Sequence, residues 1–290
     1  MIRISLNEAG LQALIDAEVP NWDTLTAKNR WSKLKPLFID VQHYKCAYCE
    51  AEFGGRVDPG GERDTQTQDV EHFRPKGKVE DWTAPDGWNM PFSVETGPST
   101  GYTWLGHEPL NYVASCIPCN RTNKKMLFPI LSALGDYSTK PSIDDLGSEK
   151  PYLVFPAATV ADTDPEKLIA FLGPTPRPHP DLDPASFDYW RAMVTIKVLN
   201  LERPDLDVPR KELVVRMAKE FVTASHFLNL DESEVLDHYC EPEKTFSACA
   251  KCYRHLCMTK PAVAKVLAVD LAEELGEPEW VRLMLEGWVV

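Results

Sequence analysis

Two pairs of cysteines carry the clearest chemistry in this sequence. Cys46 and Cys49 form one Cys-x2-Cys pair, and Cys116 and Cys119 form a second. Four thiolates in two such pairs are the ligands of a closed, tetrahedral zinc site. The alternative is that these are free cysteines in a core, but their spacing favours the metal. We therefore expect one structural Zn²⁺ on these four residues.

The segment Val70–Lys76 lies between the two pairs and holds Glu71 and His72 side by side. A histidine can act as a general base toward water near neutral pH. A neighbouring carboxylate can hold a divalent cation, which stabilises charge on a phosphate and its leaving oxygen. A lone histidine in an apolar strand is more often structural. The position of His72 between the two cysteine pairs favours catalysis instead.

Two asparagines accompany the second cysteine pair. Asn111 lies five residues before Cys116, and Asn120 follows Cys119 directly. An amide oxygen is a hard, neutral ligand that suits Mg²⁺ or Mn²⁺. Taken singly, each asparagine would be interpreted as a turn or cap residue. Their positions beside the second cysteine pair make them candidates for the same site as Glu71 and His72.

The order of these residues resembles that of a known family. The string C-x2-C, E-H-F-x-P and N-x4-C-x2-C-N-x3-K is similar to the HNH endonucleases in their zinc-bound form. The resemblance implies a ββα-metal fold in which His72 is the base and Asn111 braces the loop between the strands. It also implies that Glu71 and Asn120 bind the catalytic Mg²⁺ or Mn²⁺. The family more often has Asp or His before the base, so Glu71 departs from its pattern.

A narrower resemblance covers most of the chain. The sequence is similar to the PtuB-like HNH subunit of Septu-type anti-phage systems and of their retron-linked relatives. The matching stretches are Tyr44–Glu50, Val70–Lys76, Cys119–Pro129, Asp164–Glu166, Thr195–Leu201 with Arg210, and Phe246–Ala248. This resemblance implies a defence nuclease that works with an SMC/ABC-like ATPase subunit. The chain departs from it in a longer 77–101 loop and in its late cysteines.

Several basic residues lie close to the predicted site in sequence. Such residues could contact the phosphate backbone of a nucleic acid, and the alternative is a solvated basic face. The candidates for phosphate contact are Arg74, Lys76, Arg121 and Lys124, with Lys78 and Lys125 beside them.

A late group of cysteines and histidines offers a possible second zinc site. Its members are His238, Cys240, Cys249, Cys252, His255 and Cys257. We favour a structural role, because cysteine is commonly a small buried hydrophobe. Phe246, Ala250, Tyr253 and Cys257 fall on one helical face, and ligands spread along one helix cannot converge on one ion.

The elements that must position these residues follow from the hydrophobic pattern. Helices are expected at 7–17, with Asn7 as a cap, and at 24–43, kinked or divided by Pro36. Residues 54–69 and 77–101 are expected to be loops. Strands are expected at 70–73, 102–105, 152–155 and 168–172, with a short helix from about 119 and a helical region beyond 185. The predicted fold class is α+β: a small ββα-metal HNH module with a four-cysteine zinc site in a mainly α-helical protein, with boundaries 1–135, 136–184 and 185–290.

Composition and charge limit the class of protein. The chain has 290 residues and a formal net charge of −13, of which residues 1–135 carry −3 and the remainder −10. A chain this acidic binds nucleic acid poorly by itself, so an ATPase partner could supply DNA contacts. It has no apolar run long enough to span a membrane, and its first residues do not form a signal peptide. We therefore expect a cytoplasmic protein.

Three hypotheses remain at this point. The first is a metal-dependent endonuclease with DNA as the expected substrate. The second is a zinc-stabilised module that binds nucleic acid or protein without catalysis, and the third is a nuclease of RNA, for example tRNA. The coincidence of Glu71, His72 and Asn120 favours a nuclease, since a binding module does not need it. Nothing in the sequence separates DNA from RNA.

Overall fold

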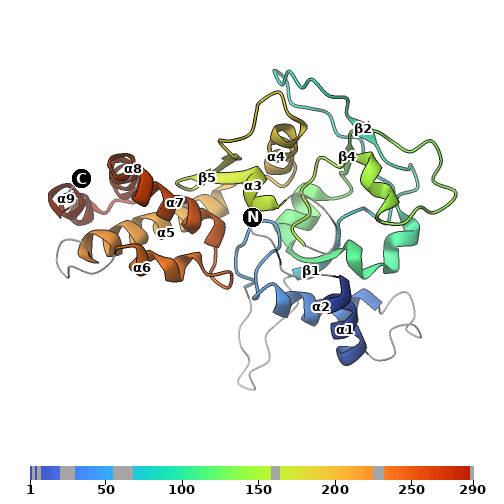
Figure 1. Cartoon of the computed structure of the whole chain (residues 1–290), viewed down its shortest axis with the longest axis horizontal. Coiled ribbons are helices and arrows are strands. Elements are labelled where there is room, and N and C mark those ends of the chain that lie inside the picture. The colour runs from blue at the N-terminus through green and yellow to red at the C-terminus, as the bar shows by residue number, and fades with distance from the viewer. Residues whose placement is uncertain are drawn as a thin grey trace. The chain divides into compact units, whose positions relative to one another are not determined.

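The computed structural model describes residues 1, 4, 8–19, 30–54, 68–157, 164–224 and 232–287. It forms two compact units, Met1–Leu168 with Pro178–Asn200, and Ile169–Arg177 with Leu201–Val290 (Figure 1). The described strands form three two-stranded sheets among many helices, which fits the α+β class. The predicted boundaries at 135 and 184 divide the chain differently, because residues 136–168 belong to the first unit.

An antiparallel strand pair forms the centre of the first unit. Strand β1 (Gln68–His72) pairs with β3 (Tyr112–Cys116), and His72 lies opposite Tyr112. Strand side chains alternate between faces, so Asp69 and Glu71 share one face of β1. Helix α2 (Arg30–Val41) packs against β1 and β3 (Figure 1), and α1 (Glu8–Glu18) packs against α2. Both helices were predicted, but Pro36 does not divide α2, while Asn7 and residues 24–29 lie outside the described residues.

Gln42 ties the first cysteine pair to β3. Its side chain follows α2 and is buried. Its amide nitrogen donates to the carbonyl oxygens of Lys45 and Ala114, at 3.0 and 2.8 Å. Its amide oxygen accepts from the backbone nitrogen of Ala114 at 2.8 Å. The Gln42 amide therefore hydrogen-bonds to β3 much as a neighbouring strand would, which places Cys46 against Cys116.

Between β1 and β3 the two ends of the 77–101 segment lie in close contact at Gly77 and Gly101, and we call this contact the glycine neck. Gly101 has φ +75°, and a Cβ there would lie 1.8 Å from the Gly77 carbonyl oxygen, so only glycine fits. The turn η2 (Thr103–His107) replaces the strand expected at 102–105. Its 3-10 hydrogen bonds, such as Leu105 nitrogen to the Tyr102 carbonyl, satisfy this backbone within the turn.

The 77–101 segment packs onto its own unit. Its strand β2 (Glu95–Thr96) pairs with β4 (Pro129–Ile130). Rings also meet helix α4 (Phe187–Val198), where Trp88 lies 5.7 Å from Trp190 and Phe92 lies 5.5 Å from Phe187 between centroids. These contacts order a stretch that composition alone predicts to be a loop.

Residues 152–155 are buried but do not form the expected strand. Side chains of α4 satisfy part of their backbone instead. The Thr195 hydroxyl accepts from the Val154 nitrogen at 3.0 Å and donates to the Tyr152 carbonyl at 3.2 Å. Arg191 adds a hydrogen bond to the Pro151 carbonyl at 3.0 Å. The remaining elements of this unit are η3 (Pro109–Asn111), η4 (Pro118–Lys124), η5 (Asp145–Glu149) and α3 (Pro165–Leu168).

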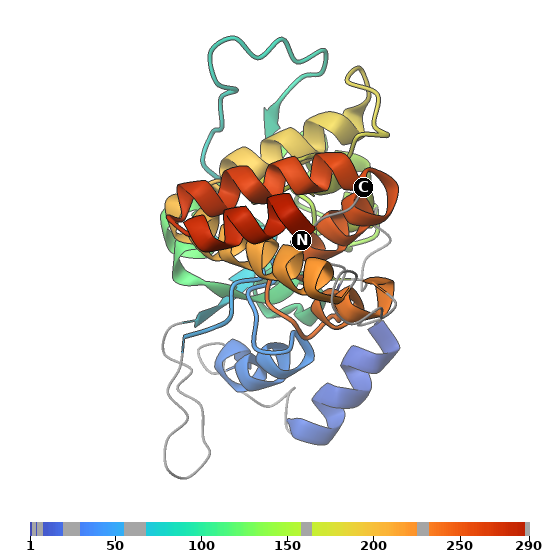
Figure 2. The same cartoon turned by 90° about the vertical axis from the view of Figure 1, so that its left-hand side faces the viewer.

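The second unit is mainly helical, as predicted for the C-terminal region. The hairpin of β5 (Ile169–Leu172) and β6 (Thr175–Pro178) turns at Gly173, whose φ is +57°. The described residues that follow form α5 (Pro204–Thr223), α6 (Glu232–Asp237), η7 (His238–Cys240), α7 (Ser247–Thr259), α8 (Pro261–Glu274) and α9 (Pro278–Gly287). Figure 2 shows α8 and α9 side by side, in red. In the part of the chain that the structure describes, no helix has the length and apolar character needed to cross a bilayer.

Candidate active site

The four cysteines of the two pairs meet in one cluster. The sulfur atoms of Cys46, Cys49, Cys116 and Cys119 all lie within 4.8 Å of one another. Cys49 and Cys116 are 3.8 Å apart between sulfurs. Zinc–sulfur bonds of about 2.3 Å in a tetrahedron place the sulfurs about 3.8 Å apart. The Cys116 nitrogen also donates to the Cys46 sulfur at 3.4 Å, so the donor set fits a zinc ion.

A cavity of about 340 Å³ brings several other predicted residues together, and we call it the Glu71–His72 cavity. It is joined to the cysteine cluster through the chain, because Asn120 follows Cys119. The short helix η4, which starts at Pro118, has π-type hydrogen bonds. In one of them the Lys125 backbone nitrogen donates to the backbone carbonyl oxygen of Asn120 at 2.7 Å. The predicted residues that line the cavity are Glu71, His72, Lys76, Asn120 and Arg121.

His72 is held in one tautomer by a backbone carbonyl. Its Nε2 lies 3.2 Å from the Gly106 oxygen, which can only accept, so Nε2 carries the proton. Nδ1 therefore keeps its lone pair. Trp31 and Tyr112 pack edge-on against the ring, with centroids 5.9 and 4.8 Å away. Burial, and then the charge of Lys76, lower the pKa of His72 to about 4, so the imidazole is neutral at pH 7.

Glu71 is buried beside a buried lysine. The Lys124 ammonium nitrogen lies 2.5 Å from a Glu71 carboxylate oxygen and 3.2 Å from the His72 carbonyl oxygen. Burial raises the pKa of Glu71, and the positive charge of Lys124 opposes that rise. Only 1% of Lys124 is exposed. The expectation that it contacts phosphate is therefore corrected: its charge faces Glu71 inside the protein.

Arg74 is also placed away from the solvent. Its guanidinium donates to the Glu149 carboxylate and, at 2.9 Å, to the Leu146 carbonyl. The Tyr102 and Phe128 rings lie 5.3 and 5.0 Å from its central carbon. Arg74 thus holds the segment after β1 onto η5, and phosphate contact was the wrong expectation for a side chain so enclosed.

Asn111 links the start of β3 to the end of β1. Its amide oxygen accepts from the Arg74 nitrogen at 2.8 Å, and its amide nitrogen donates to the Arg74 carbonyl at 2.9 Å. Asn111 is buried and lies outside the Glu71–His72 cavity lining. These two hydrogen bonds fix the backbone at Arg74, two residues beyond His72.

Asp69 is a site residue that the sequence interpretation missed. It lines the Glu71–His72 cavity, accepts from the Asn120 amide at 3.3 Å, and accepts twice from Arg121, at 2.7 and 2.6 Å. The signal was present, because residues i and i+2 of a strand share a face, and Asp69 precedes Glu71 by two. Arg121 is largely exposed but already engaged with Asp69. Lys76 stacks its ammonium 3.6 Å from the Trp31 ring centroid, at the cavity wall.

The late cysteines make individual contacts within the second unit. The Cys249 thiol donates to the Gly173 carbonyl at 3.2 Å, and the Phe171 nitrogen donates to the Cys252 sulfur at 3.3 Å. These bonds attach α7 to the β5–β6 hairpin. Among the described residues, the early cysteines are the one group of three or more metal-ligating side chains that converges.

The fold and the site together describe a mixed α and β protein with a four-cysteine cluster that could hold zinc. No family model matches the chain. The Septu protein PtuB of Bacillus mycoides (strain KBAB4) is 35% identical to it over 97 residues, which are 33% of this chain. The matched stretch spans 26%, about a quarter, of that relative's length. The likeness supports a link to Septu proteins.

Proposed function

We propose that this protein is a metal-dependent HNH-type endonuclease. The observation that carries the proposal is one cavity that gathers Glu71, His72 and Asn120 beside a four-cysteine cluster. A neutral histidine with a free Nδ1, next to a carboxylate and an amide, suits phosphodiester hydrolysis. A module that only binds nucleic acid would have no use for this combination.

The chemistry assigns each residue a role. Nδ1 of His72 takes a proton from water, whose oxygen attacks phosphorus while the bond to the leaving oxygen breaks. Glu71 and Asn120 would hold Mg²⁺ or Mn²⁺, and the bound cation supplies positive charge for the phosphate and the leaving oxygen. These residues fit a hard cation, since both offer oxygen donors and both line the same cavity. Asn111 positions the segment that follows the base.

The likeness to a Septu protein supports a role in anti-phage defence, with DNA as the expected substrate. We further propose that an SMC/ABC-like ATPase subunit delivers that substrate. Basic side chains at the cavity, Lys76 and Lys125 among them, would contact its phosphates. The alternatives are a tRNA-type RNA substrate and a zinc-stabilised binding module.

The decisive experiment incubates the purified chain with plasmid DNA and with tRNA, with Mg²⁺ or Mn²⁺ and with EDTA. We expect cleavage that needs the added cation, and a loss of about 10² to 10⁴ in rate for His72→Ala. Zinc content and circular dichroism should stay at wild-type values in that variant. His255→Ala, an exposed histidine on α7, is the matched control and should cleave normally. Wild-type cleavage by His72→Ala would remove His72 from the mechanism.

Asn120→Ala tests the metal site separately. It should raise the Mn²⁺ concentration needed for half-maximal cleavage, because one of few protein ligands is lost. Asn120→Ala also loses the hydrogen bond from Asn120 to Asp69. Arg121→Ala is therefore the control, because it removes a different hydrogen bond to Asp69 and leaves Asn120 in place. An unchanged metal requirement in Asn120→Ala would remove Asn120 from the ligand set.

A further inference from the structure

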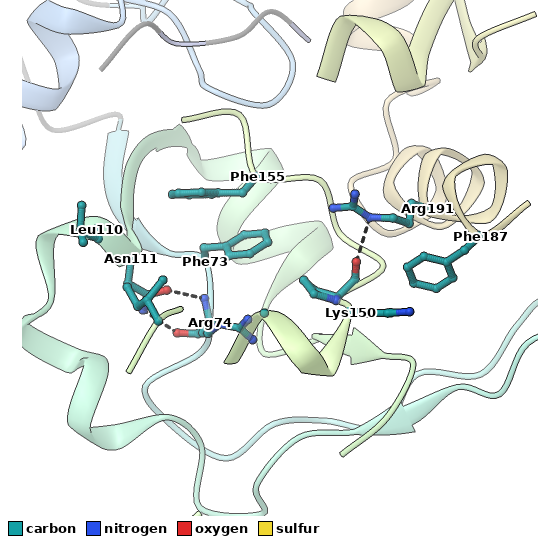
Figure 3. A pocket seen from close by; sticks show the side chains of 11 residues that line it. Phe73, Arg74, Leu110, Asn111, Lys150, Phe155, Phe187 and Arg191 are labelled. Carbon is teal, nitrogen blue, oxygen red and sulfur yellow. Dashed lines mark hydrogen bonds between the residues drawn. The ribbon is translucent and has the colours of Figure 1, made fainter. Parts of the chain in front are cut away.

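A second cavity in the first unit has a different character from the Glu71–His72 cavity, and we call it the aromatic pocket (Figure 3). Its volume is about 200 Å³. Phe73, Phe155, Phe187 and Leu110 supply much of its wall. The Phe73 and Phe155 rings lie 4.5 Å apart between centroids and are tilted by 33°, so they pack against each other at the pocket wall. Flat apolar walls of this size suit a single ring system.

The charged groups of this pocket are all basic. Arg74, Lys150 and Arg191 line it, and no described acidic side chain does. Figure 3 shows Lys150 and Arg191 together with Phe187 on one side of the pocket. Arg74 is engaged with Glu149, and Arg191 donates to the Pro151 carbonyl at 3.0 Å and lies 3.6 Å from Asp188. The exposed Lys150 is left as the cation best placed to meet a ligand.

Lys150 is held in an unusual backbone conformation. Its φ is +47°, in the left-handed region that side chains other than glycine and asparagine rarely adopt. Its backbone nitrogen donates to the Gly147 carbonyl at 3.1 Å, and its carbonyl accepts from the Leu131 nitrogen at 3.1 Å. Residues held in such sparsely populated backbone conformations often occur at ligand sites.

We propose that the aromatic pocket binds a small molecule that combines a flat ring with an anionic group, as a mononucleotide does. The ring lies against Phe73 and Phe155, and the anionic group meets Lys150 at the Phe187 side. Aromatic carboxylates share this chemistry and are the second source to be tested. Phe73 follows His72 directly, so such a ligand contacts the segment next to the proposed base. The proposal goes beyond the nuclease assignment, because binding is measured without cleavage.

Isothermal titration calorimetry on the full chain tests the pocket. The probes are AMP, GMP, CMP and UMP, the matching nucleosides, and indole-3-acetate. We expect a nucleoside monophosphate or the aromatic carboxylate to bind, and the uncharged nucleosides to bind at least about tenfold more weakly, since a charge-assisted contact is missing. Binding by the carboxylate but by none of the nucleotides assigns the second source. No binding by any anionic probe, or equal binding of nucleosides and nucleotides, overturns the proposal.

Two variants have matched controls in the same unit. Lys150→Asn removes the positive charge, and asparagine tolerates the left-handed backbone conformation at this position. The variant should therefore weaken binding about tenfold. Lys140→Asn is its control, because Lys140 is also exposed, has φ +53° and is not part of the pocket. Gly147→Leu adds bulk at a residue that lines the pocket and should weaken binding, and its Cβ meets nothing within 4 Å. Gly135→Leu is the control, because Gly135 is equally open but lies outside the pocket. Binding that survives both pocket variants would contradict the assignment.

Discussion

Lys124 and Lys125 are neighbours in sequence with opposite surroundings. Lys124 is buried against Glu71, whereas Lys125 is exposed at the Glu71–His72 cavity. Sequence spacing predicted both as basic residues near the site but could not separate them. A π-type turn decides which of the two side chains points inward, and nothing in the residue types signals that turn.

Replacing the inner lysine should therefore cost stability. Lys124→Met leaves the Glu71 carboxylate buried without its partner, and we expect a loss of about 3–5 kcal/mol in the free energy of unfolding. Urea denaturation followed by tryptophan fluorescence measures it. Lys125→Met should change stability by less than about 0.5 kcal/mol. Adding Glu71→Gln to Lys124→Met should restore part of the loss, and equal effects of the two lysine variants would contradict this account.

Local sequence patterns predict contacts between neighbouring residues but not contacts between distant parts of the chain. The four cysteines could be predicted because zinc imposes a local spacing on its ligands. The partner of Arg74, Glu149, lies 75 positions further along the chain, and no local pattern connects them. The alternation of side chains along a strand does predict Asp69 on the same face as Glu71.

At the scale of elements, zinc on the four cysteines would link β3 to η4 and to the first cysteine pair. Cys116 ends β3, and Cys119 lies in η4 directly before Asn120. Short strands such as β1 and β3 are marginal alone, so a metal bound at the Cys116 end of β3 would add to their order. The sequence predicted a strand at 70–73 from its apolar ends, and β1 (Gln68–His72) overlaps that stretch. It misplaced the strand expected at 102–105, because a 3-10 turn and a strand share the same short run of bulky residues.

Removing one ligand should expose this dependence. We expect Cys49→Ser to lose the single zinc ion measured by elemental analysis and to lower the thermal midpoint of the first unit, because zinc binding adds to its folding free energy. Cys252→Ser, in the second unit, is the control and should retain zinc. A zinc-free wild-type protein that is fully stable would rule out the structural role.

At the scale of the whole molecule, charge is the dominant property. A net charge of −13 repels a polyanion, and a few basic side chains give weak, salt-sensitive binding. The acidic excess lies mainly beyond residue 135, and part of it falls in the second unit, which has no assigned chemistry. A docking surface for a partner would explain this helical unit, and a plain stabilising bundle would explain it too.

Co-expression with the products of neighbouring genes tests the partner. We expect the chain to elute in a larger complex on size-exclusion chromatography, and to cleave DNA faster in that complex at roughly physiological salt, where surface charges are screened. The partner raises the effective concentration of the substrate at the site. An isolated chain that binds no neighbouring product and cleaves at full rate would instead be a free-standing nuclease.

The glycine neck also makes the 77–101 segment a place to attach a label. The segment turns from Pro85 to Trp88, where Gly87 has φ +84° and is exposed. Loop-closure entropy rises slowly with length, so an epitope or dye-acceptor peptide inserted after Asp86 should leave zinc content and cleavage unchanged. The same peptide inserted after Gly101 would separate the neck and reduce both. This exposed turn thus offers a place to label the protein in cells without altering either end of its chain.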